Sequence, residues 1–149
     1  MDSLLYTYAL QPNLLTLLIA AGSDVNVVHD CIEGRRVGSV TTLHYITRSD
    51  YTESYLVKLL LERGINVNTA NGMSKTALHY AIINCNVGIV DLLLKAGAST
   101  EYAKYYINQA LQFNNSPTAI KNIQMIAELI KFLPSWFQKM TPREMLENA

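Results

Sequence analysis

Three histidines and two cysteines are the residues of this chain whose types could support metal binding or nucleophilic catalysis. The segment His29-Asp30-Cys31 combines such side chains, but no second Cys/His pair follows at zinc-site spacing, and Cys85 lies 54 residues beyond Cys31. A catalytic cysteine also needs a base and an orienting group that converge in one pocket. The sequence contains no phosphate-binding or dinucleotide-binding glycine loop, nucleophile elbow or H-E-x-x-H motif. We therefore expect no catalytic residue, no metal and no cofactor, and we interpret His29-Asp30-Cys31 as part of an exposed loop.

The other two histidines, His44 and His79, stand 35 residues apart in segments that repeat one another. Thr41–Ile46 reads T-T-L-H-Y-I, and Thr76–Ala81 reads T-A-L-H-Y-A. Each segment is followed by a run rich in valine and leucine and then by a glycine, and these two glycines are 33 residues apart. A fixed period of this length indicates an array of helical repeats.

The repeated segments resemble ankyrin repeats, whose pattern is T-P-L-H-x-A, a valine and leucine helix, and then G-A-D-V-N. Gly22–Asn26 (G-S-D-V-N) and Gly64–Asn68 (G-I-N-V-N) match the last part of that pattern. The resemblance implies that His44 and His79 are structural residues that bond backbone across adjacent repeats, rather than metal ligands. Four positions depart from the pattern: Thr42 and Ala77 replace the usual proline, Ile46 replaces the usual alanine, and Cys85 stands where a glycine is usual.

The resemblance implies an all-α repeat solenoid, an ankyrin-repeat stack of helix–turn–helix units with β-finger loops and a divergent helical C-terminal cap. We expect a single domain over residues 1–149. Its expected segments are an N-terminal partial or capping repeat (1–26), an extended finger loop (27–40), repeat 2 (41–68), repeat 3 (69–101), a divergent capping repeat (102–133) and a C-terminal helix (134–149). The first segment is either a capping repeat or the remainder of a longer array.

Capping signals place the helices within these segments. Thr41 and Thr76 are expected to cap the first helices of repeats 2 and 3, and Pro12 suits the first turn of the helix before Gly22. The expected helices include residues 77–84, 87–95, 100–114 and 118–133. Helices this short are marginal alone, so their stability must come from packing on neighbours.

The finger between the first two repeats carries the largest insertion. Asn26 to Thr41 is 15 residues, whereas Asn68 to Thr76 is 8. An alternating valine and isoleucine pattern predicts an extended β-hairpin within residues 27–40. Insertions in repeat arrays map to loops, often on the binding face, so we predict that this finger carries specificity.

Composition excludes several classes of partner. Lys plus Arg is 12 and Asp plus Glu is 12, so the basic excess typical of nucleic-acid binders is absent. The longest apolar stretch, residues 14–21, is shorter than the ~20 residues that cross a bilayer. Two distant cysteines in a chain with a good apolar core favour reduced thiols. We expect a monomer in the cytoplasm, or in the host cytoplasm for a viral or effector protein, with a protein partner and with neither nucleic acid nor a membrane.

The candidate partner-binding residues come from finger tips, from the exposed side of the first helices and from exposed aromatic positions. They are His29, Asp30, Glu33, Arg35, Arg36, Arg48, Ser49, Gly72, Met73, Lys75, Ile83, Asn84, Tyr102 and Tyr105. Arg35 and Arg36 could hold an acidic partner or remain solvated, and one of Tyr102 and Tyr105 is expected to anchor an interface.

These features favour a non-catalytic protein–protein interaction module. The small, irregular repeats resemble ankyrin proteins of large DNA viruses, especially poxviruses, or of intracellular bacteria, which implies binding to a host signalling protein. Two alternatives remain: a substrate-recognition adaptor for a ubiquitin ligase, and an architectural fragment of a longer ankyrin scaffold. The poxviral adaptors end in an F-box-like segment, which residues 133–140 match only at their start.

Overall fold

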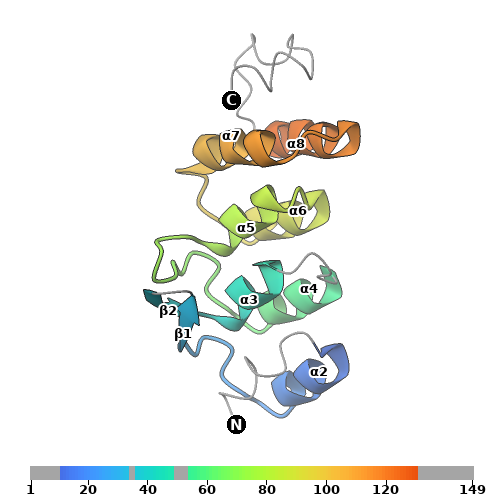
Figure 1. Cartoon of the computed structure of the whole chain (residues 1–149). Helices are drawn as coiled ribbons and strands as arrows, with labels where there is room; N and C mark the ends of the chain where they lie inside the picture. The colour runs from blue at the N-terminus through green and yellow to red at the C-terminus, as the bar shows by residue number, and fades with distance from the viewer. Residues whose placement is uncertain (1–10, 34–35, 49–53, 131–149) are drawn as a thin grey trace. The chain divides into compact units, whose positions relative to one another are not determined.

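The computed structural model describes residues 11–33, 36–48 and 54–130 (Figure 1). The chain divides into two compact units, residues 1–80 and residues 81–149, and the division falls inside helix α5 (Ala77–Ile83).

The first unit combines short helices with one β-hairpin. Its elements are α2 (Pro12–Ala20), β1 (His29–Glu33), β2 (Arg36–Val40), α3 (Thr42–Arg48), α4 (Ser54–Glu62) and the start of α5. Helix α4 packs against both α2 and α3, and β2 lies against α3. The largest fully buried side chains of these helices are Leu15, Ile19, Leu43, Ile46, Leu60 and Leu78. Their i, i+3 and i, i+4 spacing places them on one face of each helix.

The predicted capping residues define the helix ends of this unit. Pro12 is the first residue of α2, as predicted, where its missing N–H has no helical partner to lose. The Thr41 hydroxyl oxygen accepts from the His44 N–H at 3.4 Å, which confirms Thr41 as the cap of α3. Gly22 and Gly64 follow α2 and α4 with φ of +88° and +80°, a conformation that glycine adopts without a Cβ penalty.

The predicted hairpin is confirmed within the insertion. Strands β1 and β2 are antiparallel, with His29 paired to Val40 and Glu33 paired to Arg36. Residues 34–35, between the two strands in sequence, lie outside the described residues.

Among its described residues, 81–130, the second unit consists of helices joined by turns, with no strand. It contains the end of α5, α6 (Val87–Lys95), α7 (Ala103–Phe113) and α8 (Pro117–Leu129). Helix α8 packs against α6 and α7. The largest fully buried side chains of the second unit are Ile82, Ile89, Leu93, Leu111 and Ile123.

Most predicted helix bounds in this unit are close, and α7 is the main correction. Helix α6 has the predicted limits, whereas α7 begins at Ala103 instead of Thr100, because residues 100–102 form a turn closed by the Ala103 N–H on the Thr100 carbonyl at 3.0 Å. Helix α8 begins at Pro117, and the Ser116 hydroxyl caps it by accepting from the Ala119 N–H at 3.1 Å.

Two further helix ends differ from the prediction. Helix α5 ends at Ile83 instead of Asn84, because Cys85 adopts a φ of +56° and turns the chain. Helix α8 ends at Leu129, with Ile130 as its C-cap, rather than near Leu133. The helices expected in residues 1–10 and 134–149 lie outside the described residues, and the six predicted segments stay predictions.

Candidate functional site

His44 is a buried structural residue. The Thr41 backbone N–H donates to His44 Nδ1 at 3.1 Å, so Nε2 carries the proton and donates to the Lys75 carbonyl at 3.1 Å. Burial lowers the pKa of the imidazole, and bonds to the carbonyls of Lys75 and Thr69 act in the opposite direction. The bond to a backbone 31 residues ahead in the chain is the structural role that the repeat pattern implies.

His79 is also buried and stays neutral at pH 7. Burial, followed by the charge of Lys75, lowers the pKa of His79 to about 4. Its ring meets the Tyr80 ring edge to face at a centroid distance of 5.2 Å. Among residues 11–33, 36–48 and 54–130, no three His, Cys, Asp or Glu side chains lie together as a metal would require.

The loop between α4 and α5 is held rigid by one buried amide. Asn71 Oδ1 accepts the N–H groups of Met73 and Lys75, each at 3.0 Å, and Asn71 Nδ2 donates to the Tyr80 hydroxyl at 2.6 Å. The Asn71 N–H also donates to the Lys75 carbonyl at 2.8 Å, which closes the loop at its base. Ser74 takes a φ of +60°, so the loop turns sharply at a residue other than glycine.

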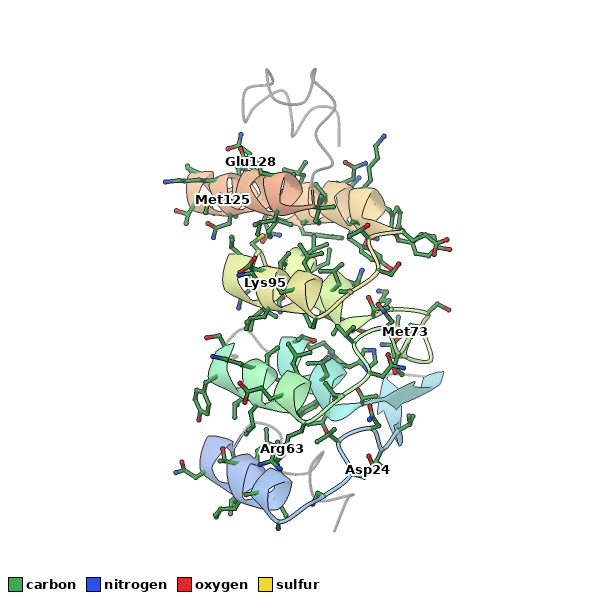
Figure 2. All side chains as sticks on the ribbon, turned by 180° about the vertical axis from the view of Figure 1, so that it is seen from behind. Asp24, Arg63, Met73, Lys95, Met125 and Glu128 are labelled. Atoms are coloured by element: carbon green, nitrogen blue, oxygen red, sulfur yellow. The ribbon has the colours of Figure 1, made fainter. Side chains whose placement is uncertain are left out.

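These bonds present Gly72 and Met73 at the loop tip. The Met73 side chain is 38% exposed, and Figure 2 shows it at the end of the loop, on the side of the helices from which the β-hairpin also projects. An apolar side chain held outward by a rigid loop is a suitable contact for a partner.

Arg48 and Tyr80 join the end of α3 to this loop. The Arg48 guanidinium carbon lies 5.9 Å from the centroid of the Tyr80 ring, a cation–π geometry. The Tyr80 ring also meets the His44 ring edge to face at 6.4 Å. Arg48, Tyr80, Asn71 and Lys75 thus form a connected set, which we call the Tyr80 cluster.

The structure brings together only some of the predicted site residues. Arg48 and Lys75 belong to the Tyr80 cluster, and Gly72 and Met73 lie on the loop that Asn71 holds. His29, Asp30 and Glu33 lie on β1 and Arg36 lies on β2, whereas Arg35 and Ser49 lie outside the described residues.

Sequence reasoning missed Asn71 and Tyr80. The available signals were a tyrosine directly after each repeated histidine, and an asparagine three residues before Ser74, the position where the loop takes a positive φ.

A second group of predicted residues lies in the unit of residues 81–149. The Ile83 carbonyl accepts from Asn114 Nδ2 at 3.3 Å, which places Ile83 and Asn84 beside the C-terminal end of α7. The next residue, Cys85, has a buried thiol whose pKa is raised by desolvation. A buried, protonated thiol is a poor nucleophile.

Tyr102 and Tyr105 flank the buried Tyr106. Their exposed fractions are 60% and 59%, and their ring centroids lie 6.5 Å and 5.9 Å from that of Tyr106. Burial raises the pKa of Tyr106, and Tyr102 and Tyr105 add to the shift. Tyr102 and Tyr105 are therefore exposed, as predicted, and Tyr106 is buried.

No described helix is long and apolar enough to cross a membrane.

Comparisons with known proteins agree with the observed repeat. Residues 5–104 match the family model for ankyrin repeats in three copies. The chain is 47% identical over 58 residues to the ankyrin repeat and LEM domain-containing protein 1 homolog of Caenorhabditis elegans, and the aligned segment covers 38% of this chain and 8% of that protein. It is 32% identical over 92 residues to a putative ankyrin repeat protein of Acanthamoeba polyphaga mimivirus, and this aligned segment covers 62% of this chain and 54% of the viral protein. The predicted all-α repeat fold and the resemblance to a viral ankyrin protein are confirmed, and the chain belongs to the ankyrin-repeat family.

Proposed function

We propose that this chain is a non-catalytic protein-binding module and that its partner contacts the Tyr80 cluster. Ankyrin repeats mediate protein–protein binding, and the family is generally non-catalytic. The observation that carries the proposal is the hydrogen-bonded loop of Asn71, which fixes the backbone at Met73 and Lys75 and is linked through Tyr80 to the Arg48 guanidinium. A preformed contact surface loses little conformational entropy on binding.

The charge of this surface favours an acidic partner segment. Arg48 is exposed and Lys75 is half-buried, and both extend from positions that hydrogen bonds or ring contacts hold in place. Arginine held over an aromatic ring is a preferred anchor at interfaces. That Arg35 and Arg36 also contact an acidic partner stays a prediction.

The hairpin of residues 29–40 is proposed to select the partner. It is the element in which this chain departs most from the repeat pattern, and it packs against α3, the helix that carries Arg48. The similarity to a putative ankyrin repeat protein of a mimivirus agrees with a viral protein, and for such a protein we propose a host signalling protein in the cytoplasm as the partner. The alternative adaptor function depends on residues 133–140, which lie outside the described residues.

Affinity purification followed by mass spectrometry tests this proposal. Four full-length proteins are compared: wild type, a variant whose finger is shortened to the length of the second finger, Arg48→Ala/Lys75→Ala, and Lys58→Ala/Arg63→Ala. The last variant removes two exposed cations of the same unit away from the Tyr80 cluster. We expect the shortened finger to change the partner list, and the Arg48/Lys75 variant to weaken capture about tenfold while the control keeps it. Identical partner lists for all four proteins would refute the proposal.

A further inference from the structure

One side of α7 exposes a continuous set of aromatic and amide side chains. Tyr102, Tyr105, Gln109 and Phe113 follow at spacings of three or four residues, which places them along one stripe of the helix. Tyr102, Tyr105 and Phe113 are 60%, 59% and 74% exposed. We define the α7 face as this stripe together with its exposed or half-buried neighbours Glu101, Asn108 and Gln112.

The rings of the α7 face are held in place from below. The buried Tyr106 contacts the rings of both Tyr102 and Tyr105, and Gln109 Nε2 donates to the Tyr105 hydroxyl at 2.9 Å. Because the Tyr105 oxygen accepts this bond, its own proton and the Gln109 carbonyl oxygen remain to bond a ligand. Exposed aromatic rings with few rotatable bonds and fixed neighbours lose little entropy on binding.

The charge of the α7 face is the opposite of that around Tyr80. Its one ionised group is Glu101, and the exposed Lys104 lies at its margin, one turn before Asn108 and about 100° around the helix from Tyr105. Aromatic faces carry a negative quadrupole, and amide carbonyls accept hydrogen bonds from cationic donors. We propose that the α7 face binds an extended protein segment that carries arginine or lysine side chains.

The length of the face sets the length of the segment. From Tyr102 to Phe113 the helix rises about 16 Å, which an extended chain covers with about five residues. Cationic side chains at alternate positions of such a segment point the same way, so one can lie over the tyrosine pair and another over Phe113.

Single-stranded nucleic acid is the competing class of ligand, because its bases stack on exposed aromatic rings. Such sites combine the rings with cations that track the phosphates. The α7 face instead places the Glu101 carboxylate beside Tyr102, which repels a phosphate backbone. The charge therefore favours the basic protein segment.

Fluorescence anisotropy with the full chain tests the proposal. The probes are fluorescein-labelled ten-residue peptides in which alanine alternates with arginine, lysine, glutamine or glutamate, an uncharged proline-rich peptide, and a single-stranded RNA, all at 150 mM salt. We expect the arginine peptide to bind at least tenfold more tightly than the glutamine peptide, and the glutamate peptide and the RNA to bind most weakly. Equal binding of the arginine and glutamine peptides, or tighter binding of the RNA or the proline-rich peptide, would overturn the proposal.

Variants locate the binding and separate it from the Tyr80 cluster. Tyr102→Ala/Tyr105→Ala should lower affinity for the arginine peptide about tenfold, whereas Tyr55→Ala, which removes a 47% exposed tyrosine from α4, should leave it unchanged. If the double variant unfolds, Glu101→Arg at an exposed position replaces it, and unchanged affinity of that variant overturns the proposal. The variant with the shortened finger should bind the arginine peptide like wild type, so failure of one surface is distinguishable from failure of the other.

Discussion

Replacing Asn71 with alanine is expected to destabilise the protein, because one side chain makes three hydrogen bonds. It accepts the N–H groups of Met73 and Lys75 and donates to the Tyr80 hydroxyl. Asn71 itself is buried, with 8% of its surface exposed, so its amide was desolvated to make these bonds.

The size of the effect follows from what water can restore. Met73 is exposed, so its N–H can bond water once the Asn71 side chain is removed. Lys75 and Tyr80 are half-buried, so the Lys75 N–H and the Tyr80 hydroxyl regain fewer hydrogen bonds to water. At about 1 kcal/mol for each bond, Asn71→Ala should cost about 2–3 kcal/mol of unfolding free energy. For a cooperative chain of 149 residues this lowers Tm by roughly 6–10 °C.

Asn71→Asp separates the hydrogen bonds from the amide group. A carboxylate still accepts both N–H groups, and the Tyr80 hydroxyl can donate to its second oxygen. We therefore expect Asn71→Asp to remain within about 1 kcal/mol of wild type.

Urea unfolding and amide hydrogen exchange at Met73 and Lys75 measure these effects. Asn66→Ala is the matched control, because the Asn66 side chain accepts one N–H, from Asn68 at 3.0 Å, on an exposed turn. Its cost should be below about 1 kcal/mol. The reasoning fails if Asn71→Ala unfolds at the wild-type urea concentration, or if Asn71→Asp loses as much stability as Asn71→Ala.

Three other perturbations have defined outcomes. Leu93→Ala should lower the free energy of unfolding by about 2–5 kcal/mol, because Leu93 is fully buried. Leu17→Ala, at a 65% exposed position, should change the urea midpoint little, and equal losses for the two variants would contradict the assigned buried face. Because folding lowers the pKa of His79 from 6.5 to about 4, the folded state is fully stable above pH 6.5. Its free energy of unfolding decreases as the pH falls from 6.5 towards 4, since the unfolded chain then binds the proton more tightly. Allowing for solvent screening, urea unfolding at pH 7.5 and 5.5 should differ by about 1 kcal/mol, and a His79→Gln variant should show a smaller difference. Asn26→Ala should accelerate hydrogen exchange of the Asn66 amide, because Asn26 Oδ1 accepts that N–H at 2.7 Å, and unchanged exchange would show that this bond is not formed in solution.

The repeat pattern predicted the helices because each of their determinants is local. The valine and leucine run, the preceding polar break and the following glycine together predicted α6 with its observed limits. Helix α7 was harder, because no Ser, Thr, Asn or Asp occupies its N-cap; Tyr102 stands there and makes no capping bond. A turn over residues 100–102 was therefore indistinguishable in sequence from a first helical turn.

Cys85 stands where the repeat pattern usually has a glycine, and the structure shows the backbone conformation that a glycine would adopt there without strain. A glycine was expected there, and Cys85 indeed has a φ of +56°, which costs about 1–2 kcal/mol for a residue with a Cβ. The sulfur contacts the Ile83 carbonyl at 3.8 Å and the side chain is buried, so packing offsets part of that strain. The repeat pattern identifies such a position, but the net effect of backbone strain and side-chain burial on stability can be judged only from the atoms that surround it.

Hydrogen bonds between neighbouring repeats form the framework that positions the proposed contact residues. Asn26 links to Gly64 and Asn66, and His44 links to Lys75, across distances in sequence of about one repeat. Such bonds join one repeat to the next and belong to the framework of the array. The residues proposed to meet a partner are those that the framework holds in place but does not use, such as Met73 at the loop tip and Tyr105 on α7. Because these exposed side chains make no bond that the repeat requires, they can differ without loss of the fold. The period of the sequence therefore predicts the scaffold, whereas the choice of partner depends on the exposed residues.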